Sequence, residues 1–221
     1  MIGVFDSGAG GRFALRELRR LRGDIDIAFL ADEENAPYGE RSEGELIRLV
    51  ENDIKRLRSV GADKILIACC TASTVWDKLG AEYRRDTYPI IAPVARRALS
   101  VSRGGRIGVI STEATKRSGA FQGFIPDALC HAAPELVTLA ESGACDGNLT
   151  ESQRNIIKKA VEPFSGCDVD TLILGCTHFA YFEREIEGIL GIPTVNSARV
   201  AAREMAKRVE NEGSGKTVWL T

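Results

Sequence analysis

The sequence of 221 residues predicts an α/β fold made of two similar halves, each with a parallel sheet covered by helices. Segments 64–73 (KILIACCTAS) and 171–180 (TLILGCTHFA) share one plan, in which a short apolar run leads into a Cys and then a Thr. Segment 106–111 (RIGVIS) also resembles the N-terminal MIGVFDS, as if the architecture restarts there. Short, continuously apolar runs are typical of strands buried on both faces.

The first half begins with a strand expected at 2–5, followed by Asp6, Ser7 and a glycine turn. The turn leads into a helix at 11–21, and a second strand follows at 25–31. Phe13 occupies the third glycine position of a dinucleotide-binding GxGxxG loop, so we interpret the turn as a tight strand-to-helix connection rather than an NAD site.

The next helix opens at a capping box formed by Ser42 and Glu45, and Gly61 ends it. A strand then leads to Cys69. The rest of the chain predicts further elements from its apolar periodicity. They are helices at 75–85, 114–124, 181–190 and 198–211, strands at 89–94, 106–111, 136–139, 171–174 and 193–195, and a helix that starts at Thr150 with Gln153 as capping partner.

The last helix, with Ser197 as its expected N-cap, follows the second half and is expected to cross back to the first. We therefore predict one domain from residues 1–94 plus 197–221 and a second from residues 95–196. No low-complexity linker separates them, so a broad interface between the halves is expected.

Composition and charge exclude several classes of protein. The net charge is -2 with dispersed Lys and Arg, which leaves no basic footprint for nucleic acid. No apolar run approaches the roughly 20 residues that span a bilayer, and the N-terminus lacks a charged signal-peptide region. We therefore expect a cytoplasmic protein that binds neither nucleic acid nor membrane.

The chain contains six cysteines, and we expect no disulfides because these are rare in reducing compartments. No CxxC pair is present and the only histidines are His131 and His178, so no metal site is predicted. Three of the cysteines lie outside the repeated plan and are interpreted as structural: Cys130, Cys145 and Cys167.

Cys69 and Cys176 are both expected where a strand gives way to a helix, at the sheet edge where α/β proteins bind ligands. The free N–H groups of a following helix would favour the thiolate. Two thiols that face each other across a cleft, one ionised and one protonated, can exchange one proton with a carbon from opposite sides.

Neighbouring residues can assist both thiols. Asp6, at the end of the first strand, is placed to serve Cys69, and His178 is placed to serve Cys176. Hydroxyl groups that suit a small polar ligand are those of Ser7, Thr71, Ser73 and Thr177. Each residue also has a structural interpretation, since a lone buried Cys usually only packs and Asp6 or Ser7 can simply cap a helix. The matched contexts of the two thiols favour catalysis.

Four motifs occur in the order found in one known family. GVFDSGAGG at 3–11, PYGERS at 37–42, ACCTAS at 68–73 and LGCTH at 174–178 resemble those of glutamate racemases, in the Asp/Glu racemase superfamily. The resemblance implies two flavodoxin-like α/β domains with the active site in the cleft between them. It also implies a cofactor-independent racemase that interconverts L- and D-glutamate, supplies D-glutamate for peptidoglycan, and forms a homodimer.

The resemblance also implies roles for single residues. Cys69 and Cys176 would act on opposite faces of the α-carbon, with Asp6 and His178 assisting and Glu141 lying near the second thiol. The residues expected to contact the substrate are Ser7, Tyr38, Gly39, Cys70, Thr71 and Thr177.

Cys70 departs from the family, which usually has Asn at this position. A thiol lacks the donors and the acceptor of an amide, and such a lost contact costs about 1 to 3 kcal/mol. Two alternatives therefore stay open. One is an aspartate racemase or another member of the superfamily, and the other is a catalytically silent amino-acid-binding homologue.

Overall fold

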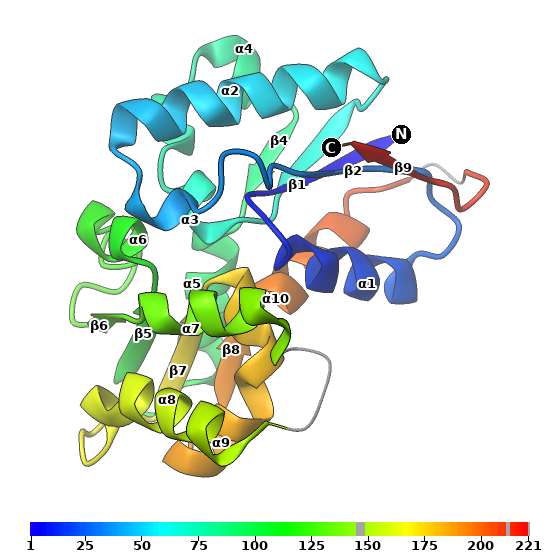
Figure 1. The fold of residues 1–221 in the computed structure, drawn as a ribbon. Coiled ribbons are helices and arrows are strands. Elements are labelled where there is room, and N and C mark those ends of the chain that lie inside the picture. The colour runs from blue at the N-terminus through cyan, green and yellow to red at the C-terminus, as the bar shows by residue number, and fades with distance from the viewer. Residues whose placement is uncertain (145–148, 211–212, 221) are drawn as a thin grey trace.

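The computed structural model describes residues 1–144, 149–210 and 213–220. Two parallel sheets form the fold (Figure 1). The first has the strand order β4-β3-β1-β2-β9, and the second has the order β6-β5-β7-β8. The strands are β1 (Ile2–Asp6), β2 (Ile27–Ala31), β3 (Lys64–Ile67), β4 (Thr87–Pro89), β5 (Ile107–Ser111), β6 (Leu129–Ala132), β7 (Thr171–Gly175), β8 (Thr194–Asn196) and β9 (Thr217–Leu220).

Helices cover both faces of each sheet, as expected for an α/β fold. The α-helices are α1 (Gly11–Leu21), α2 (Glu43–Ser59), α3 (Cys70–Ser73), α4 (Ala81–Arg84), α5 (Ile91–Val101), α6 (Glu113–Ser118), α7 (Pro134–Leu139), α8 (Glu151–Val161), α9 (Glu183–Leu190) and α10 (Ser197–Ala206). The other helical segments are η1 (Tyr38–Glu40), η2 (Trp76–Lys78), η3 (Ala140–Ala144), η4 (Glu162–Phe164) and η5 (Thr177–Phe182). None of the helices in the described part of the chain is long and apolar enough to cross a membrane.

The core has three layers. One apolar cluster joins the first sheet to α2, and another joins the second sheet to α7, α8 and α9. The third and largest cluster lies between the sheets and combines residues of α1, α5 and α10 with Val4 and Val109. Figure 1 shows α1 and α10 side by side between the sheets. The two halves therefore share a broad apolar interface, as predicted.

The strands at the centre of each sheet confirm the sequence prediction. Every residue of β1, β2, β5 and β7 is buried, which explains their continuously apolar sequences. The capping boxes of α2 and α8 are also present, and in each the N-cap hydroxyl and the side chain three residues later satisfy each other's backbone N–H.

Two predicted strands are wrong. Segment 89–94 contains only the end of β4, and α5 begins at Ile91. Pro93 lies in the first turn of α5, where the missing N–H costs nothing. Segment 136–139 belongs to α7, which begins at Pro134. Both segments are short apolar runs, which periodicity alone does not assign to strand or helix.

Two predicted helices are shorter than expected. Segment 75–85 is divided into η2 and α4 by extended backbone at Leu79. Segment 114–124 is helical only as far as Ser118, the end of α6, and the C-cap residue Gly119 has a φ of 66°. A positive φ suits glycine because a side chain would clash there.

The last helix also differs from its prediction. Asn196, not Ser197, caps α10, since its side chain accepts a hydrogen bond from the Arg199 N–H. Residue 211, the predicted end, lies outside the described residues. Edge strands β6 and β9 had no counterpart among the predicted elements.

Candidate active site

Asp6 ends β1 at the carboxyl edge of the first sheet and is fully buried. Its Oδ1 accepts a hydrogen bond from Gly8 N at 3.0 Å, and its Oδ2 accepts one from Thr177 Oγ1 at 3.0 Å. Burial raises the pKa of Asp6 to about 7, although these hydrogen bonds oppose the shift. The side chain thus links the first glycine turn to the segment that follows β7 in the second half.

Cys69 follows β3 and caps the single turn of α3. Its Sγ accepts a hydrogen bond from Ala72 N at 3.4 Å and lies 3.3 Å from Ser7 Oγ. Burial, with a smaller contribution from the negative charge of Asp6, raises the pKa of the Cys69 thiol to about 11. The Ala72 N–H at the helix N-terminus does favour the thiolate, as the sequence predicts, but burial outweighs this and the other local donors.

Cys176 occupies the matching position after β7 and precedes η5. Burial and the neighbouring thiols Cys69 and Cys70 raise its pKa well above the usual range. Its Sγ lies 3.7 Å from Nδ1 of His178. Both predicted catalytic cysteines are free thiols, as are Cys70, Cys130 and Cys167, while Cys145 lies outside the described residues.

His178 is buried beside the second thiol, and burial lowers its pKa to about 4. The imidazole is therefore neutral at neutral pH and can accept a proton from Cys176. Its Nε2 lies 3.5 Å from Oε1 of Glu141, but it has no hydrogen-bond partner among the described residues. Glu141 itself is partly exposed on η3, and burial raises its pKa, with a further contribution from Glu33.

One cavity of about 160 Å³ brings these groups together. This volume is below the roughly 300 Å³ of a typical drug-sized pocket, so the cavity suits a small ligand. The predicted residues that line it are Ser7, Tyr38, Gly39, Cys69, Cys70, Thr71, Glu141, Cys176, Thr177 and His178. Asp6 does not line the cavity, but it accepts a hydrogen bond from the cavity residue Thr177.

Ser73 does not belong to the cavity wall, contrary to the prediction that its hydroxyl would help to hold a ligand. Its Oγ donates a hydrogen bond to the Ile67 carbonyl at 3.2 Å and accepts one from Ile90 N at 3.1 Å. The side chain thus connects the end of β3 to the start of α5.

The sequence interpretation missed Thr112 and Thr115, at the start of α6. Thr71 Oγ1 lies 2.9 Å from Thr112 Oγ1 and 3.2 Å from Thr115 Oγ1, so these hydroxyls connect the two halves at the cavity. The sequence did contain a signal for Thr112. The similarity of RIGVIS to MIGVFDS places Thr112 after β5 as Ser7 is placed after β1.

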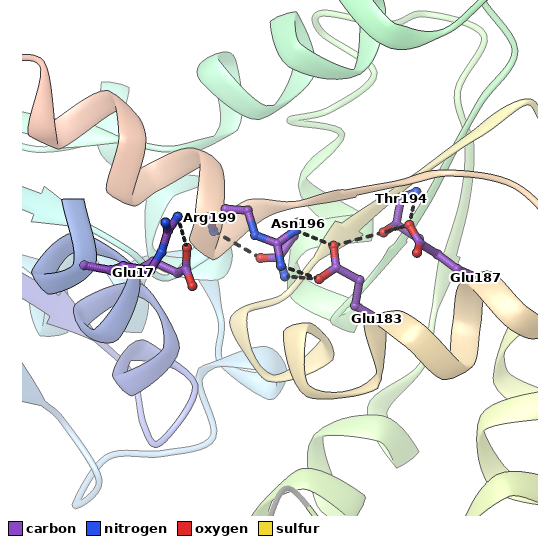
Figure 2. Close-up of polar contacts among 7 residues, drawn as sticks. Glu17, Glu183, Glu187, Thr194, Asn196 and Arg199 are labelled. Carbon is purple, nitrogen blue, oxygen red and sulfur yellow. Dashed lines mark hydrogen bonds and ion pairs between the residues drawn. The ribbon is translucent and has the colours of Figure 1, made fainter.

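The segment that carries Cys176 and His178 is also fixed at its far end. Arg199 on α10 makes a two-pronged ion pair with Glu183, with N–O distances of 2.9 and 2.7 Å. Asn196 Nδ2 donates to the same carboxylate at 3.2 Å (Figure 2). Paired bonds of this type restrict orientation, so the network holds the junction of η5 and α9 against α10.

The glycine turn allows the two halves to approach closely. A Cβ atom at Gly10 would lie 2.4 Å from Thr177 Oγ1 and 2.8 Å from the His178 backbone N. Real Cβ contacts are not this short, so the turn or η5 would have to move.

We expect Gly10→Ala to lower kcat by about 10-fold or more, because small displacements of reacting groups slow an enzymatic reaction. Steady-state kinetics measure the effect, and Gly44→Ala, at a site with nothing within 4 Å, is the matched control. Unchanged kinetics in Gly10→Ala would contradict the close approach.

The fold and site define a class: an α/β protein whose two parallel sheets each present a free thiol to one small cavity. The family model described as Asp/Glu/hydantoin racemase matches residues 27–205. The chain belongs to this racemase family.

Individual relatives agree with this assignment. A glutamate racemase from Aquifex aeolicus is 37% identical over 220 residues, which cover 97% of this chain and 85% of that protein. The crystal structure of a glutamate racemase isoform from Bacillus anthracis superposes with a TM-score of 0.88 at 29% identity, covering 99% of this chain and 86% of that one. Escherichia coli glutamate racemase was crystallised with L-glutamate and the activator UDP-MurNAc-Ala. It superposes with a TM-score of 0.77 at 27% identity, covering 96% of this chain and 84% of that one.

Proposed function

We propose that the protein is a glutamate racemase that uses Cys69 and Cys176 as its two acid–base groups. The observation that carries the proposal is that two free thiols, one from each sheet, line a single small cavity. The glutamate racemase relatives support glutamate as the substrate.

The reaction needs one thiolate and one thiol. The thiolate removes the α-hydrogen of the substrate, and the thiol on the other face donates its proton to the resulting carbanion. One S–H bond forms while the other breaks, the configuration at the α-carbon is inverted, and the charges of the two sulfurs are exchanged.

Burial keeps both thiols protonated, so a neighbouring base must take one proton before the first step. We assign this role to Asp6 on the Cys69 side, where its charge acts on the pKa of the thiol. On the Cys176 side we assign it to neutral His178, and Glu141 stabilises the imidazolium once it forms. Oxygen atoms of Ser7, Thr71 and Thr177 would hold the polar groups of the substrate. Tyr38, Gly39 and Cys70 complete the proposed substrate-binding wall.

The family resemblance supports a proposal for the cellular role. We propose a cytoplasmic homodimer that supplies D-glutamate for peptidoglycan. We also propose domain boundaries that separate residues 1–94 plus 197–221 from residues 95–196, supported by the pairing of β9 with β2 in the first sheet.

Cys70 favours a second candidate, an aspartate racemase. Its side chain is buried in the cavity wall, and it offers a substrate carboxylate fewer donors than an amide. The two candidate substrates differ by one methylene group.

We expect racemisation of L-glutamate to be at least about 10-fold faster than that of L-aspartate, since one methylene changes specificity by roughly 10- to 200-fold. Loss of optical activity and uptake of deuterium at the α-carbon in D2O measure both reactions. Turnover of aspartate alone would establish the second candidate, and absence of exchange with either amino acid would identify a silent binding protein.

A further inference from the structure

A buried acidic cluster, which the proposed reaction does not use, lies behind the cavity wall. Asp32 follows β2, Tyr38 begins η1, and Asp53 lies in the middle of α2, and their exposed fractions are 2%, 1% and 0%. Asp53 is on the inner face of α2 beside Val50, Ile54 and Leu57, where the helical pattern calls for an apolar residue. A charged group at such a place is costly unless it is paired or neutral.

If both carboxyl groups were ionised, the cluster would hold too few protons for its two short hydrogen bonds. Tyr38 Oη lies 2.6 Å from Asp32 Oδ2 and 2.8 Å from Asp53 Oδ2. A phenol has one proton to donate, whereas an ionised carboxylate only accepts. One of the two short contacts therefore needs a proton that a carboxyl group provides.

The complete burial of Asp53 on the apolar inner face of α2 favours the proton on this carboxyl group. Asp32 accepts a further hydrogen bond from Asn35 Nδ2 at 3.0 Å, which suits a carboxylate. Asp53 Oδ1 accepts one from Arg56 Nη1 at 3.1 Å, and Asp53 Oδ2 faces Tyr38. The same Arg56 nitrogen lies 3.8 Å from Asp32 Oδ1, and its charge opposes protonation of Asp53 without outweighing burial. Burial, followed by the charge of Asp32, raises the pKa of Asp53 to about 6.

Tyr38 connects this cluster to the cavity. The next residue, Gly39, packs so closely against Thr112 that an added Cβ would lie 3.0 Å from the threonine Cβ. Thr112 in turn is hydrogen bonded to Thr71 in the cavity wall. Movement of the Tyr38 ring would therefore shift the wall where both halves meet.

We propose that Asp53 donates a carboxylic proton to Tyr38 Oη and is a positioning residue that holds the η1 turn against the substrate cavity. The proposal rests on the proposed function, since it assumes that Tyr38 and Gly39 form the substrate-binding wall.

The hydrogen bond from Asp53 to Tyr38 is expected to be lost as pH rises. The groups that face Asp53 are Asp32 and Tyr38, from the segment after β2, and Arg56 from α2. Asp53 keeps its proton below about pH 6 and loses it above. Two carboxylates then face one hydroxyl, and the turn loosens. Binding of glutamate should therefore weaken as pH rises, while Asp53→Asn keeps an N–H donor at every pH.

The test compares KM and kcat for glutamate from about pH 5 to about pH 8 in the wild type, Asp53→Asn, Asp53→Leu and the surface control Glu43→Gln. The ratio of the Asp53→Asn KM to the wild-type KM should fall about 5-fold over this range, and Asp53→Leu should raise KM about 10-fold with kcat changed less than about 3-fold. Comparison with Asp53→Asn removes the contribution of other titrating groups.

The infrared carbonyl band of a protonated carboxyl group gives a readout that does not need activity. Asp6 is also protonated at about pH 5, so the Asp53 contribution is read as a difference between variants. The wild type and Glu43→Gln should share a component of this band that Asp53→Asn lacks. If Asp53→Asn kept the full wild-type intensity of this band, or a KM profile identical to that of the wild type, the assignment would be overturned. A wild type that shows the Asp53 component but does not turn over glutamate would instead contradict the proposed function.

Discussion

Replacement of either Cys69 or Cys176 by serine is expected to lower kcat for glutamate racemisation by about 10³-fold or more. A hydroxyl is far less acidic than a thiol and is seldom ionised near neutral pH, so the altered side loses its base. In the reverse reaction the serine hydroxyl is also a poor proton donor. Because racemisation needs both faces of the substrate, either replacement stops the full reaction, which circular dichroism of the amino acid follows directly.

The matched control is Cys167→Ser, which changes an exposed thiol that does not line the cavity and should leave kcat within about 2-fold. Deuterium exchange adds a sharper criterion. The thiol that remains in each variant contacts one face only, so Cys69→Ser and Cys176→Ser should retain slow exchange with opposite enantiomers of glutamate. Full racemisation by either variant would remove that cysteine from the mechanism.

The two-sheet architecture could be predicted from the sequence because its central strands carry a local signal. β1, β2, β5 and β7 are buried on both faces and are apolar except for Asp6, Ser111 and Thr171 at strand ends. Edge strands lack this signal. β6 and β9 expose Leu129 by 41% and Trp219 by 54%, and their pairing depends on neighbours that are distant in sequence.

The thiol pair could also be predicted, because a repeated strand–Cys–Thr plan places both residues at equivalent sheet edges. The ionisation of the thiols could not, since it depends on burial by residues from both halves. The same holds for Asp53, which is one polar residue in an amphipathic helix until the fold brings Tyr38 and Asp32 to it. The sequence shows which chemical groups are present, whereas the electrostatic environment of each group depends on how the chain packs around it.

Asp6→Asn is the second replacement with a large expected effect, a decrease in kcat of about 10²-fold. Asparagine has nearly the shape of aspartate and can still accept the Gly8 N–H, so the glycine turn should keep its conformation. The amide cannot accept the proton that Cys69 must lose. Removal of the negative charge also lowers the pKa of Cys69, since Asp6 raises it in the wild type, and this partly offsets the loss.

The dependence of kcat on pH separates a base from a structural residue. With a pKa of about 7, Asp6 is ionised above that pH and protonated below it, so wild-type kcat should rise as pH increases through about 7. Asp6→Asn should lose this rise. Thr177→Val should shift the rise to higher pH, because the hydroxyl hydrogen bond lowers the pKa of Asp6 in the wild type.

Asp77→Asn neutralises an exposed carboxylate in the same half and should leave the profile unchanged. Circular dichroism and thermal unfolding of Asp6→Asn exclude loss of the fold as the cause of low activity. If Asp6→Asn kept both the wild-type kcat and the rise near pH 7, Asp6 would be a cap for the first glycine turn. Proton removal from Cys69 would then need another acceptor at the cavity.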